Sequence, residues 1–471
     1  MTGKLEISLV LKTDWKGGVV FTFATAPKSV TVESAGKDAG DIRFDPTNKK
    51  AIVSLGAPDK VSPEMIRRAG GAIAKWISKN DLSEVGIDLT SLPVNNLPLE
   101  SSVGALVEGL LLGGFTFEKY KSSKKNSVSK AQLLTGKDSK SLRTVVERAT
   151  ITSEAVNLSR EWAHEPPNVI NPVSLAGRVQ KLASEVGLKC RVLDDKQLEK
   201  MGAGAIVAVG KGSATPSRLI VLEYPGKSRG KPIVLVGKSI TFDTGGYSIK
   251  SGEGMVGMKY DKSGGMAVIA TLVAAARLGL KTPLVGIVAA AENMISGSSY
   301  RPNDIIKAMN GKTIEVISAD AEGRLVLSDA LVYAQKTYKP RALIDIATLT
   351  GGVVIALGSI RAGFMANNDA LADSLSPSGE KTFERLWRLP LDDEYFDLIK
   401  GDDSDMKNSG ARKAHPIIGG IFLKQFVSED IPWAHIDIAG VADTDKDLPY
   451  CPKGATGFGV RLFLDYLSTL K

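Results

Sequence analysis

Apolar residues in the first third of the chain follow two spacings, one typical of strands and one typical of helices. Residues 5–9 alternate apolar with polar side chains, which predicts a strand with one buried face. Residues 62–79 have helical periodicity, with Ser62 in the N-cap position and Pro63 opening the first turn. Two further strand patterns and one further helical pattern cover 51–55, 85–89 and 101–112.

From residue 139 onward the apolar runs become longer and more continuous. A helical pattern over 139–162 ends before Pro166 and Pro167, and we expect this helix to connect two domains. The runs that follow have no polar face, which is typical of strands buried on both sides of a parallel sheet. Strands alternating with helices predict a mostly parallel central sheet flanked by helices. These continuous runs are 218–223, 233–237, 284–290, 313–317, 342–346 and 353–357.

The length of 471 residues is more than one hydrophobic core holds, because single cores stop growing at about 250–300 residues. We therefore expect an α/β protein of two domains. The smaller N-terminal α/β domain is expected at 1–145. The larger C-terminal α/β domain, which contains the central sheet, is expected at 146–471.

The composition is that of a globular protein with a modest positive charge. Hydrophobic residues make up 43% of the chain and charged residues 24%, which excludes a disordered, collagen-like or coiled-coil protein. The formal net charge is +8 and the pI is about 9.1. This surplus permits contact with nucleic acid but does not indicate it. The Lys- and Ser-rich stretch 120–130 is interpreted as a solvated loop.

Cysteine content and apolar segments bear on the compartment. Cys190 and Cys451 are the only cysteines, which excludes a disulfide scaffold and favours a reducing compartment. The N-terminal residues contain no apolar segment of the signal-peptide type. The most apolar stretch, 266–294, is interrupted by Arg277 and Pro283, so we expect a buried helix and strand rather than a membrane span. A cytoplasmic protein without a membrane partner is expected.

Two glycine-containing segments resemble nucleotide-binding motifs without fulfilling them. A Walker A motif ending in Gly237-Lys238-Ser239 would need a glycine where Pro232 stands. Residues 252–257 match GxGxxG, but no strand pattern precedes them. Neither segment predicts a phosphate site.

Acidic residues gather in three short blocks of the second half of the chain. Each block lies just after a predicted strand or just before a predicted helix, where ligands bind in open α/β sheets. The charged residues of the blocks are Lys238, Asp243 and Lys250, then Asp261, then Asp320, Glu322 and Arg324.

The spacing within the third block favours a shared site. Asp320 and Glu322 are two positions apart, so an extended segment places both carboxylates on one face. The alternative is that these residues, or Asp261, cap the helices that follow, and that Asp243 belongs to a turn. Grouped carboxylates repel one another, so a shared site needs cations. Four carboxylates suit two divalent ions about 3.5–4 Å apart, and Mg, Mn and Zn are all compatible.

Such two-metal sites serve peptidases, phosphatases and nucleases, and the residues by themselves leave these classes open. Taken together, however, the segments VGKSITFDTGGYSIK, MKYDKSGG and SADAEGRLVLSDAL resemble the leucyl aminopeptidase family of dimetal cytosolic exopeptidases. The likeness extends to IDIATLTGG, WAHIDIAG and GATGFGVRLFLDYL, and it is weaker over roughly the first 150 residues. It implies that the larger domain is catalytic. The implied activity is metal-dependent hydrolysis of the N-terminal bond of short peptides, with Leu-like residues preferred.

The resemblance also implies a mechanism. Two divalent ions, Zn or Mn, would be bridged by a hydroxide that attacks the peptide bond. Lys250 would stabilise the oxyanion, and Arg324 would hold a bicarbonate ion that acts as general base. The implied metal ligands are Lys238, Asp243, Asp261, Asp320 and Glu322. The implied substrate-binding residues are Met258, Thr348, Leu349 and Gly351.

The likeness has consequences for partners and one departure. It implies a homohexamer whose sites face an inner cavity that admits short peptides with a free N-terminus. Some bacterial relatives also bind DNA, so DNA is an alternative partner. Ser318-Ala319 stands where the family usually has Asn-Thr, and position 318 borders the pocket, so the side-chain preference stays open. No implied metal or catalytic position is altered, which favours an active enzyme over an inactive paralogue.

The three histidines lie outside the acidic blocks. His435 lies in an apolar run and is predicted to be a core residue. His164 and His415 are next to or near prolines and are predicted to lie in loops. None is predicted to bind a metal.

Overall fold

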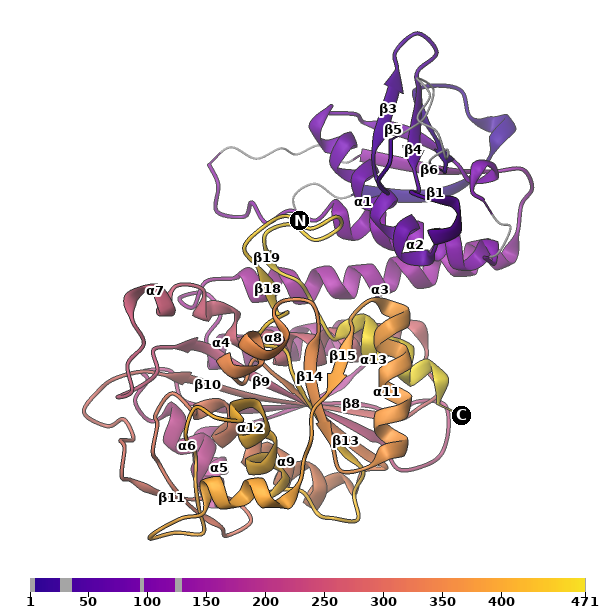
Figure 1. The fold of residues 1–471 in the computed structure, drawn as a ribbon. Helices are drawn as coiled ribbons and strands as arrows, with labels where there is room; N and C mark the ends of the chain where they lie inside the picture. Colours follow the sequence, from indigo (N-terminus) through magenta and orange to yellow (C-terminus); the bar gives the residue numbers. More distant parts are fainter. Residues whose placement is uncertain (1–4, 26–35, 94–96, 123–128, 471) are drawn as a thin grey trace. The chain divides into compact units, whose positions relative to one another are not determined.

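The computed structural model describes residues 5–25, 36–93, 97–122 and 129–470. The chain forms two compact units, shown in Figure 1. The N-terminal unit comprises Met1–Asn157 and Thr444–Gly454, and the C-terminal unit comprises Leu158–Asp443 and Ala455–Lys471. The division falls inside the long helix α3 (Lys140–His164).

The N-terminal unit is built around one mixed sheet. Within the described residues this sheet has six strands in the order β1-β6-β5-β2-β4-β3. All neighbouring strands are parallel except β3 and β4. The strands are β1 (Leu5–Leu11), β2 (Val19–Ala24), β3 (Ile42–Asp45), β4 (Lys50–Ser54), β5 (Glu84–Asp88) and β6 (Ser129–Thr135).

Two helices, α1 (Pro63–Lys79) and α2 (Leu99–Gly113), pack on this sheet and share its core. Helix α1 begins where the sequence predicts, because the Ser62 hydroxyl accepts a hydrogen bond from the Met65 N–H at 3.4 Å. The two helices approach closely at Gly109. A Cβ atom there would lie 2.0 Å from the Arg67 carbonyl oxygen.

A segment near the C-terminus completes the N-terminal unit. Lys75 donates to the Leu448 carbonyl oxygen at 2.7 Å, and the Tyr450 hydroxyl donates to the Glu64 carboxylate at 3.1 Å. Gly71 makes room for the segment, because a Cβ atom there would lie 2.4 Å from the Pro449 carbonyl oxygen. Two short strands flank it, β18 (Asp443–Thr444) and β19 (Gly454–Ala455).

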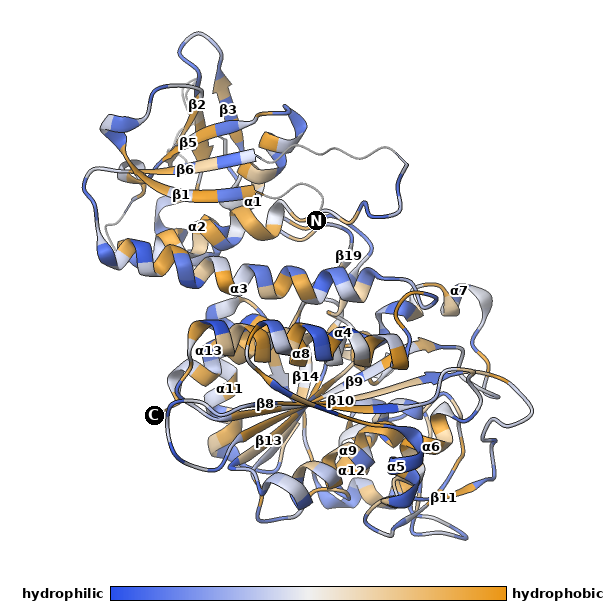
Figure 2. Cartoon of the chain, turned by 180° about the vertical axis from the view of Figure 1, so that it is seen from behind, coloured by the Kyte–Doolittle hydropathy of each residue, from blue (hydrophilic) through white to orange (hydrophobic). Residues whose placement is uncertain are grey.

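The C-terminal unit has a larger sheet with the order β15-β14-β17-β13-β9-β10-β8-β7. The four central strands β17, β13, β9 and β10 are parallel, and antiparallel strands join at both sides. Figure 2 colours the central strands as apolar over most of their length. The strands are β7 (Lys189–Leu193), β8 (Arg218–Tyr224), β9 (Ile233–Asp243), β10 (Leu284–Asn293), β13 (Ala342–Ala347), β14 (Ala362–Ala366), β15 (Leu386–Arg388) and β17 (Trp433–Asp437).

Helices cover both faces of this sheet (Figure 1). One face carries α4 (Pro172–Glu185), α8 (Ser263–Leu278), α11 (Asp369–Thr382) and α13 (Val460–Thr469). The other face carries α6 (Gly204–Gly210), α9 (Glu322–Tyr338) and α12 (His415–Lys424), with α5 (Asp195–Lys200) beside α6. The two-domain α/β class expected from the sequence is therefore confirmed, as is the mostly parallel character of the central sheet.

Two of the predicted strands of the central sheet are wrong. Residues 353–357 belong to a helix, α10 (Gly351–Leu357), which the Thr350 side chain caps through the Val353 N–H at 3.3 Å. A short apolar run does not by itself separate a strand from a helix. Residues 313–317 contribute only β12 (Thr313–Glu315), which lies in a separate small sheet with β11 (Ile305–Lys307) and β16 (Met406–Lys407).

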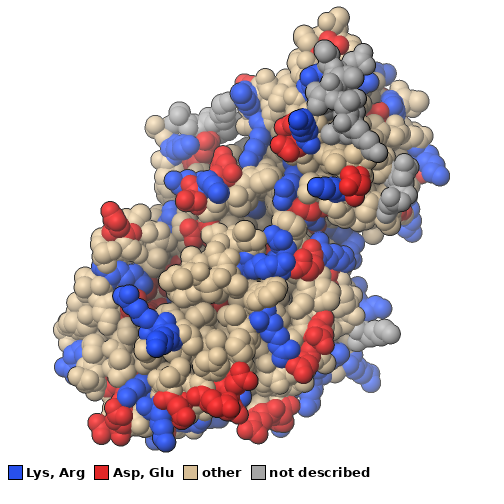
Figure 3. Space-filling model, viewed as in Figure 1, with Lys and Arg blue, Asp and Glu red and all other residues tan. Residues whose placement is uncertain are grey.

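Two further predictions concern the surface and the membrane. In the stretch 120–130, residues 123–128 lie outside the described residues, Lys121 pairs with Glu118 at 3.0 Å, and β6 begins at Ser129. Positive and negative side chains are interspersed over the face drawn in Figure 3. Among the described helices, none has the length and apolar character needed to cross a membrane.

Candidate active site

The first acidic block lies on β9, and a bulge decides which way its side chains point. Lys238 lies inside β9, which continues to Asp243, beyond the predicted run 233–237. Ile240 pairs with Ala291 and Asp243 pairs with Asn293, so β9 has one more residue than β10 between these pairs. A regular strand would place positions five apart on opposite faces. The extra residue brings Lys238 and Asp243 to the same face.

Lys238 belongs to the first block, is buried, and connects the second block to the third through ion pairs. Its Nζ lies 2.9 Å from the Asp261 carboxylate and 2.8 Å from Glu322 Oε1. It also donates to the Thr348 carbonyl oxygen at 2.8 Å. Gly323 leaves the space for this side chain, because a Cβ atom there would lie 2.7 Å from Lys238 Nζ.

Asp261 does not cap the helix that follows it. It lies in a short 3-10 helix, η4 (Met258–Lys262), and its carboxylate accepts hydrogen bonds from Lys238 at 2.9 Å and from the Thr348 hydroxyl at 2.7 Å. Glycines allow helix α8 to pack closely against β9 and β13. A Cβ atom on Gly264 would lie 2.2 Å from the Ile346 carbonyl oxygen, and one on Gly237 would meet Gly265 at 2.6 Å. This close packing sets Asp261 beside β9.

The third block forms the turn before α9 and the start of that helix. The N-cap residue of α9 is Ala321, with no side-chain cap, so neither Asp320 nor Glu322 caps the helix in the way the alternative supposed. Lys250 lies 2.9 Å from the Asp243 carboxylate and is also ion-paired with Asp320. Asp243 also accepts from the Gly245 N–H at 2.9 Å, so its turn role and its place in the cluster coexist.

Three of the acids have the arrangement of a metal-binding group. One carboxylate oxygen each from Asp243, Asp320 and Glu322 lie within 4.8 Å of one another. Glu322 Oε2 is buried and has no hydrogen-bond partner among the described residues. Hard oxygen ligands that converge and remain unsatisfied fit divalent cations.

Burial and mutual repulsion perturb the acids. Burial, reinforced by the negative charge of Asp243 and opposed by Lys238, raises the pKa of Glu322 to about 8. Burial likewise raises the pKa of Asp261 and of Asp320. Perturbed carboxylates of this kind gather at functional sites.

The two lysines respond in the opposite sense to burial. Burial alone would lower the pKa of Lys238, but Asp261, Glu322 and Asp243 outweigh burial and hold the pKa above its usual range. The pKa of Lys250 is raised for the same reason. Both side chains therefore carry a positive charge among the carboxylates.

Arg324 lies two residues after Glu322, in the first turn of α9, and is fully buried. Its Nη1 donates to the Asn408 carbonyl oxygen at 2.8 Å, whereas its Nε has no hydrogen-bond partner among the described residues. Burial lowers the pKa of Arg324 to about 10, and Glu322 and Asp437 oppose this. A buried guanidinium with a free donor is a place for an anion.

The implied substrate-binding residues lie in η4, just after β13 and at the start of α10. Thr348 contacts both Lys238 and Asp261, as described above, and Met258 opens η4. Leu349 is held by Asp437, which accepts from its N–H at 3.0 Å. Gly351 is the first residue of α10, and a Cβ atom there would meet nothing within 4 Å.

Four buried polar residues support the site without appearing in the sequence prediction. Asn293 donates to Asp243 at 2.8 Å, and the Tyr300 hydroxyl donates to the Ala319 carbonyl oxygen at 2.5 Å. Asp437 holds the Leu349 turn, and Asn408 holds the segment before Asp320. Asn293 and Asp437 are polar side chains within or just after apolar runs, whereas the sequence around Tyr300 and Asn408 carries no such signal.

The histidines lie outside the carboxylate group. His435 is buried in β17, with Nδ1 2.5 Å from Asp345, in line with the predicted core position. The predicted loop positions of the other two are wrong: His164 is the last residue of α3 and His415 the first of α12. A proline is tolerated in the first turn of a helix, so Pro416 does not exclude a helix at His415.

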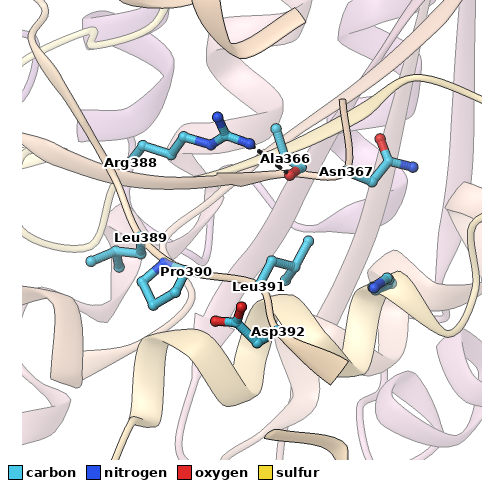
Figure 4. Close-up of a pocket in the computed structure, with 8 residues that line it drawn as sticks. Ala366, Asn367, Arg388, Leu389, Pro390, Leu391 and Asp392 are labelled. Carbon is cyan, nitrogen blue, oxygen red and sulfur yellow. Dashed lines mark hydrogen bonds between the residues drawn. The ribbon is translucent and has the colours of Figure 1, made fainter. Parts of the chain in front are cut away.

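A surface pocket of about 500 Å³ lies apart from the carboxylates (Figure 4). Ala366, at its wall, pairs with Ala434 near the start of β17, whereas the acids lie near the ends of the parallel strands. Its cations are already paired, Arg388 with Asp369 at 2.6 Å and Lys424 with Asp393 at 2.5 Å. The pocket is therefore not part of the carboxylate site.

Comparisons with known proteins agree with this geometry. The family model "Cytosol aminopeptidase family, catalytic domain" matches residues 157–464, and the N-terminal domain model of that family matches 43–124. A "Probable cytosol aminopeptidase" of Syntrophotalea carbinolica is 45% identical over 430 residues, covering 90% of this chain and 86% of the relative. One from Aquifex aeolicus is 43% identical over 422 residues, covering 88% and 84%.

A solved structure has the same fold along almost the whole chain. It is described as "Bottromycin maturation enzyme BotP in complex with Mn", and it has a TM-score of 0.88 and 30% identity. The match covers 96% of this chain and 98% of the other. From its sequence and its fold, the chain belongs to the cytosol aminopeptidase family of hydrolases, whose members are exopeptidases.

Proposed function

We propose that this protein removes N-terminal residues, Leu-like ones by preference, from short peptides with a free N-terminus by means of two divalent metal ions. The convergence of the Asp243, Asp320 and Glu322 oxygens within 4.8 Å carries the proposal. Lys238 forms ion pairs with Asp261 at 2.9 Å and with Glu322 at 2.8 Å, and Lys238 and Asp261 thereby extend this group to a second ligand set.

The residues divide between the two ions. Asp243, Asp320 and Glu322, with the Asp320 carbonyl oxygen, would hold one ion, and Asp243, Asp261, Glu322 and Lys238 would hold the other. Lys238 would ligate as a neutral amine, because the entering ion displaces the proton that the side chain carries in the metal-free site. When bound, the ions lower the pKa of a water molecule and polarise the scissile carbonyl. Zn and Mn both suit ligands of this type, and one solved relative is described as a complex with Mn.

Two cationic side chains do the remaining work in this proposal. Lys250 lies beside Asp243 and Asp320 and is less buried than Lys238, so it can turn toward a substrate carbonyl and stabilise its oxyanion. Arg324 presents its unpartnered Nε to an anion, and bicarbonate held there would take the proton of the attacking water.

In this proposal Met258, Thr348, Leu349 and Gly351 line the side-chain pocket or contact the peptide backbone, and Ser318 borders the pocket. We further propose a cytoplasmic homohexamer, as in the family that the sequence resembles.

The proposal is tested with metal-stripped protein and leucine amide as substrate. Mn²⁺ or Zn²⁺ is titrated in while bound metal is counted by elemental analysis, and N-acetyl-leucine amide is the control substrate. We expect hydrolysis of the free amine alone, rising to a plateau near two ions per chain. No hydrolysis with two ions bound would contradict the proposal.

A matched pair of lysine variants tests the mechanism in the same assay. Lys250→Ala is expected to lower kcat by about 10²–10³-fold, the usual effect of losing a transition-state donor. Lys200→Ala, an exposed lysine of α5, is expected to leave kcat unchanged.

A further inference from the structure

Asn408 uses its polar groups to join two parts of the candidate site. It follows β16 directly and is fully buried. Its Oδ1 accepts from the Ile317 N–H at 2.8 Å and from the Ser318 N–H at 3.2 Å. Its Nδ2 donates to the Ser318 carbonyl oxygen at 2.7 Å. Its own N–H continues the strand ladder by donating to Glu315 O at 2.9 Å.

The orientation of this side-chain amide is fixed by its partners. Two backbone N–H groups need an acceptor and one carbonyl oxygen needs a donor, so only one of the two amide orientations satisfies all three. The amide thus takes the place of a neighbouring strand for residues 317 and 318, which lie beyond the end of β12. Asp320 follows two residues later and donates its N–H to the Ser318 hydroxyl at 3.2 Å.

The main chain of the same residue holds Arg324. The Asn408 carbonyl oxygen accepts from Arg324 Nη1 at 2.8 Å, and among the described residues the guanidinium has no other hydrogen bond. The position of this carbonyl is set by the side-chain amide, because the amide clamps residue 408 onto the Ile317–Ser318 segment. A shift of the pocket segment therefore also shifts the acceptor of Arg324.

We propose that Asn408 is a positioning residue that fixes the pocket segment Ile317–Ser318 and the guanidinium of Arg324 as one unit. The inference rests on the proposed aminopeptidase function and deepens it. In this proposal two properties of the enzyme depend on the one buried amide of Asn408. They are the preference for the substrate side chain, set near Ser318, and the catalytic rate that Arg324 supports. The hydrogen bonds of Asn408 go to the main chain of residues 315, 317 and 318 and to the Arg324 guanidinium rather than to the carboxylate group.

A double-mutant cycle of Asn408→Ala and Arg324→Ala tests the link to rate. We expect Asn408→Ala to lower kcat by about 10–100-fold, the usual effect of losing a residue that orients an active-site group. In the Arg324→Ala background the same change should lower kcat less than threefold, because the group being positioned is gone. If the kcat of the double variant is lowered by the product of the two single-variant effects, the two residues act independently and the proposal is overturned.

A second measurement tests the link to the pocket. The ratio of kcat/KM for leucine amide to that for alanine amide should change at least threefold in Asn408→Ala, and should do so in the Arg324→Ala background as well. Asn408→Asp keeps the shape and the acceptor but opposes the Ser318 carbonyl oxygen, so it should change the ratio in a protein that folds normally. An unchanged ratio in both variants would overturn the proposal.

Asn367 provides the matched control. Its amide also joins two main-chain groups, donating to Ile431 O at 3.0 Å and accepting from the Trp433 N–H at 2.7 Å, but it lies at the pocket of Figure 4. Asn367→Ala should leave both the ratio and the cycle unchanged. If the wild-type enzyme hydrolyses no amide, the proposed function fails and the role of Asn408 fails with it. If the wild type is active but the losses multiply, only the role of Asn408 fails.

Discussion

Lys238 reaches its carboxylate partners only because residue 323 has no side chain. A Cβ atom there would come within 2.7 Å of both Cε and Nζ of Lys238. Lys238 is held by Asp261, Glu322 and the Thr348 carbonyl oxygen, so it cannot move aside without losing at least one of these partners. The glycine of the SADAEGRL segment is thus explained by the space that a buried lysine needs.

Gly323→Ala is therefore expected to disturb the site. Alanine favours a helix over glycine by about 1 kcal/mol, which offsets only part of the loss of a buried Lys238 partner, so the thermal midpoint should fall. The displaced Lys238 should weaken metal binding and lower kcat/KM by about 10–100-fold. Metal titration measures the change in metal binding, and amide hydrolysis measures the change in kcat/KM. Gly177→Ala in α4 is the control, since a Cβ atom there meets nothing within 4 Å. Full activity of Gly323→Ala would contradict this explanation.

Among the elements, α9 carries both the site and its anchor. Glu322 and Arg324 lie in its first turn, and Asp329 lies near its middle. The buried carboxylate of Asp329 accepts from the N–H groups of Ala205 at 2.9 Å, Ile206 at 3.0 Å and Met309 at 2.8 Å. It therefore fixes α9 to the start of α6 and to the turn after β11.

Asp329 also makes stability depend on pH. Burial raises the pKa of this carboxyl to about 7, although the three N–H groups favour its charged form. An unfolded aspartate has a pKa of about 3.9, so the folded chain retains a proton that the unfolded chain releases between about pH 4 and 7. The folded state binds more protons over this window, so the contribution of Asp329 to stability falls as pH rises through it.

The variant Asp329→Asn removes this titration. As pH rises from 5 to 7, the thermal midpoint of the wild type should decline relative to that of the variant. The corresponding loss in the free energy of unfolding is at most about 1.4 kcal/mol per pH unit. Scanning calorimetry of both proteins at pH 5, 6 and 7 makes the comparison. Midpoints that change in parallel would contradict the raised pKa.

At the scale of the whole molecule, apolar side chains of the C-terminal unit remain exposed. Ile355 on α10 is 91% exposed, Ile360 65% and Trp387 on β15 55%. Exposed apolar groups of this size commonly mark surfaces that bind other proteins. Copies of the same chain are the partners that fit the proposed hexamer.

Sedimentation should therefore find a species of about 300 kDa, six times the mass of one chain. Ile355→Glu is expected to shift the protein toward smaller species, because a charge would have to be buried at the contact. Lys200→Glu on exposed α5 is the control. A wild-type protein that sediments as a monomer at every concentration would contradict the hexamer.

The sequence by itself determined the fold class and most elements, because these depend on local periodicity. Ser62 and Pro63 started α1 as predicted, and the continuous run 233–237 predicted a strand buried on both faces. The sequence also contains the acidic blocks and resembles the family closely enough to indicate it. Local patterns failed where a short apolar run was ambiguous, as at 353–357, which is α10 rather than a strand.

Only the tertiary structure decided how the blocks meet. The bulge in β9 turns Asp243 to the face of Lys238, Gly264 lets α8 bring Asp261 against the sheet, and Gly323 leaves the space for Lys238. The supporting amide of Asn408 comes from a segment far along the chain. A local pattern records which side chains are apolar, whereas these contacts depend on which backbones approach closely enough to share hydrogen bonds. That approach is set by packing across the whole C-terminal unit.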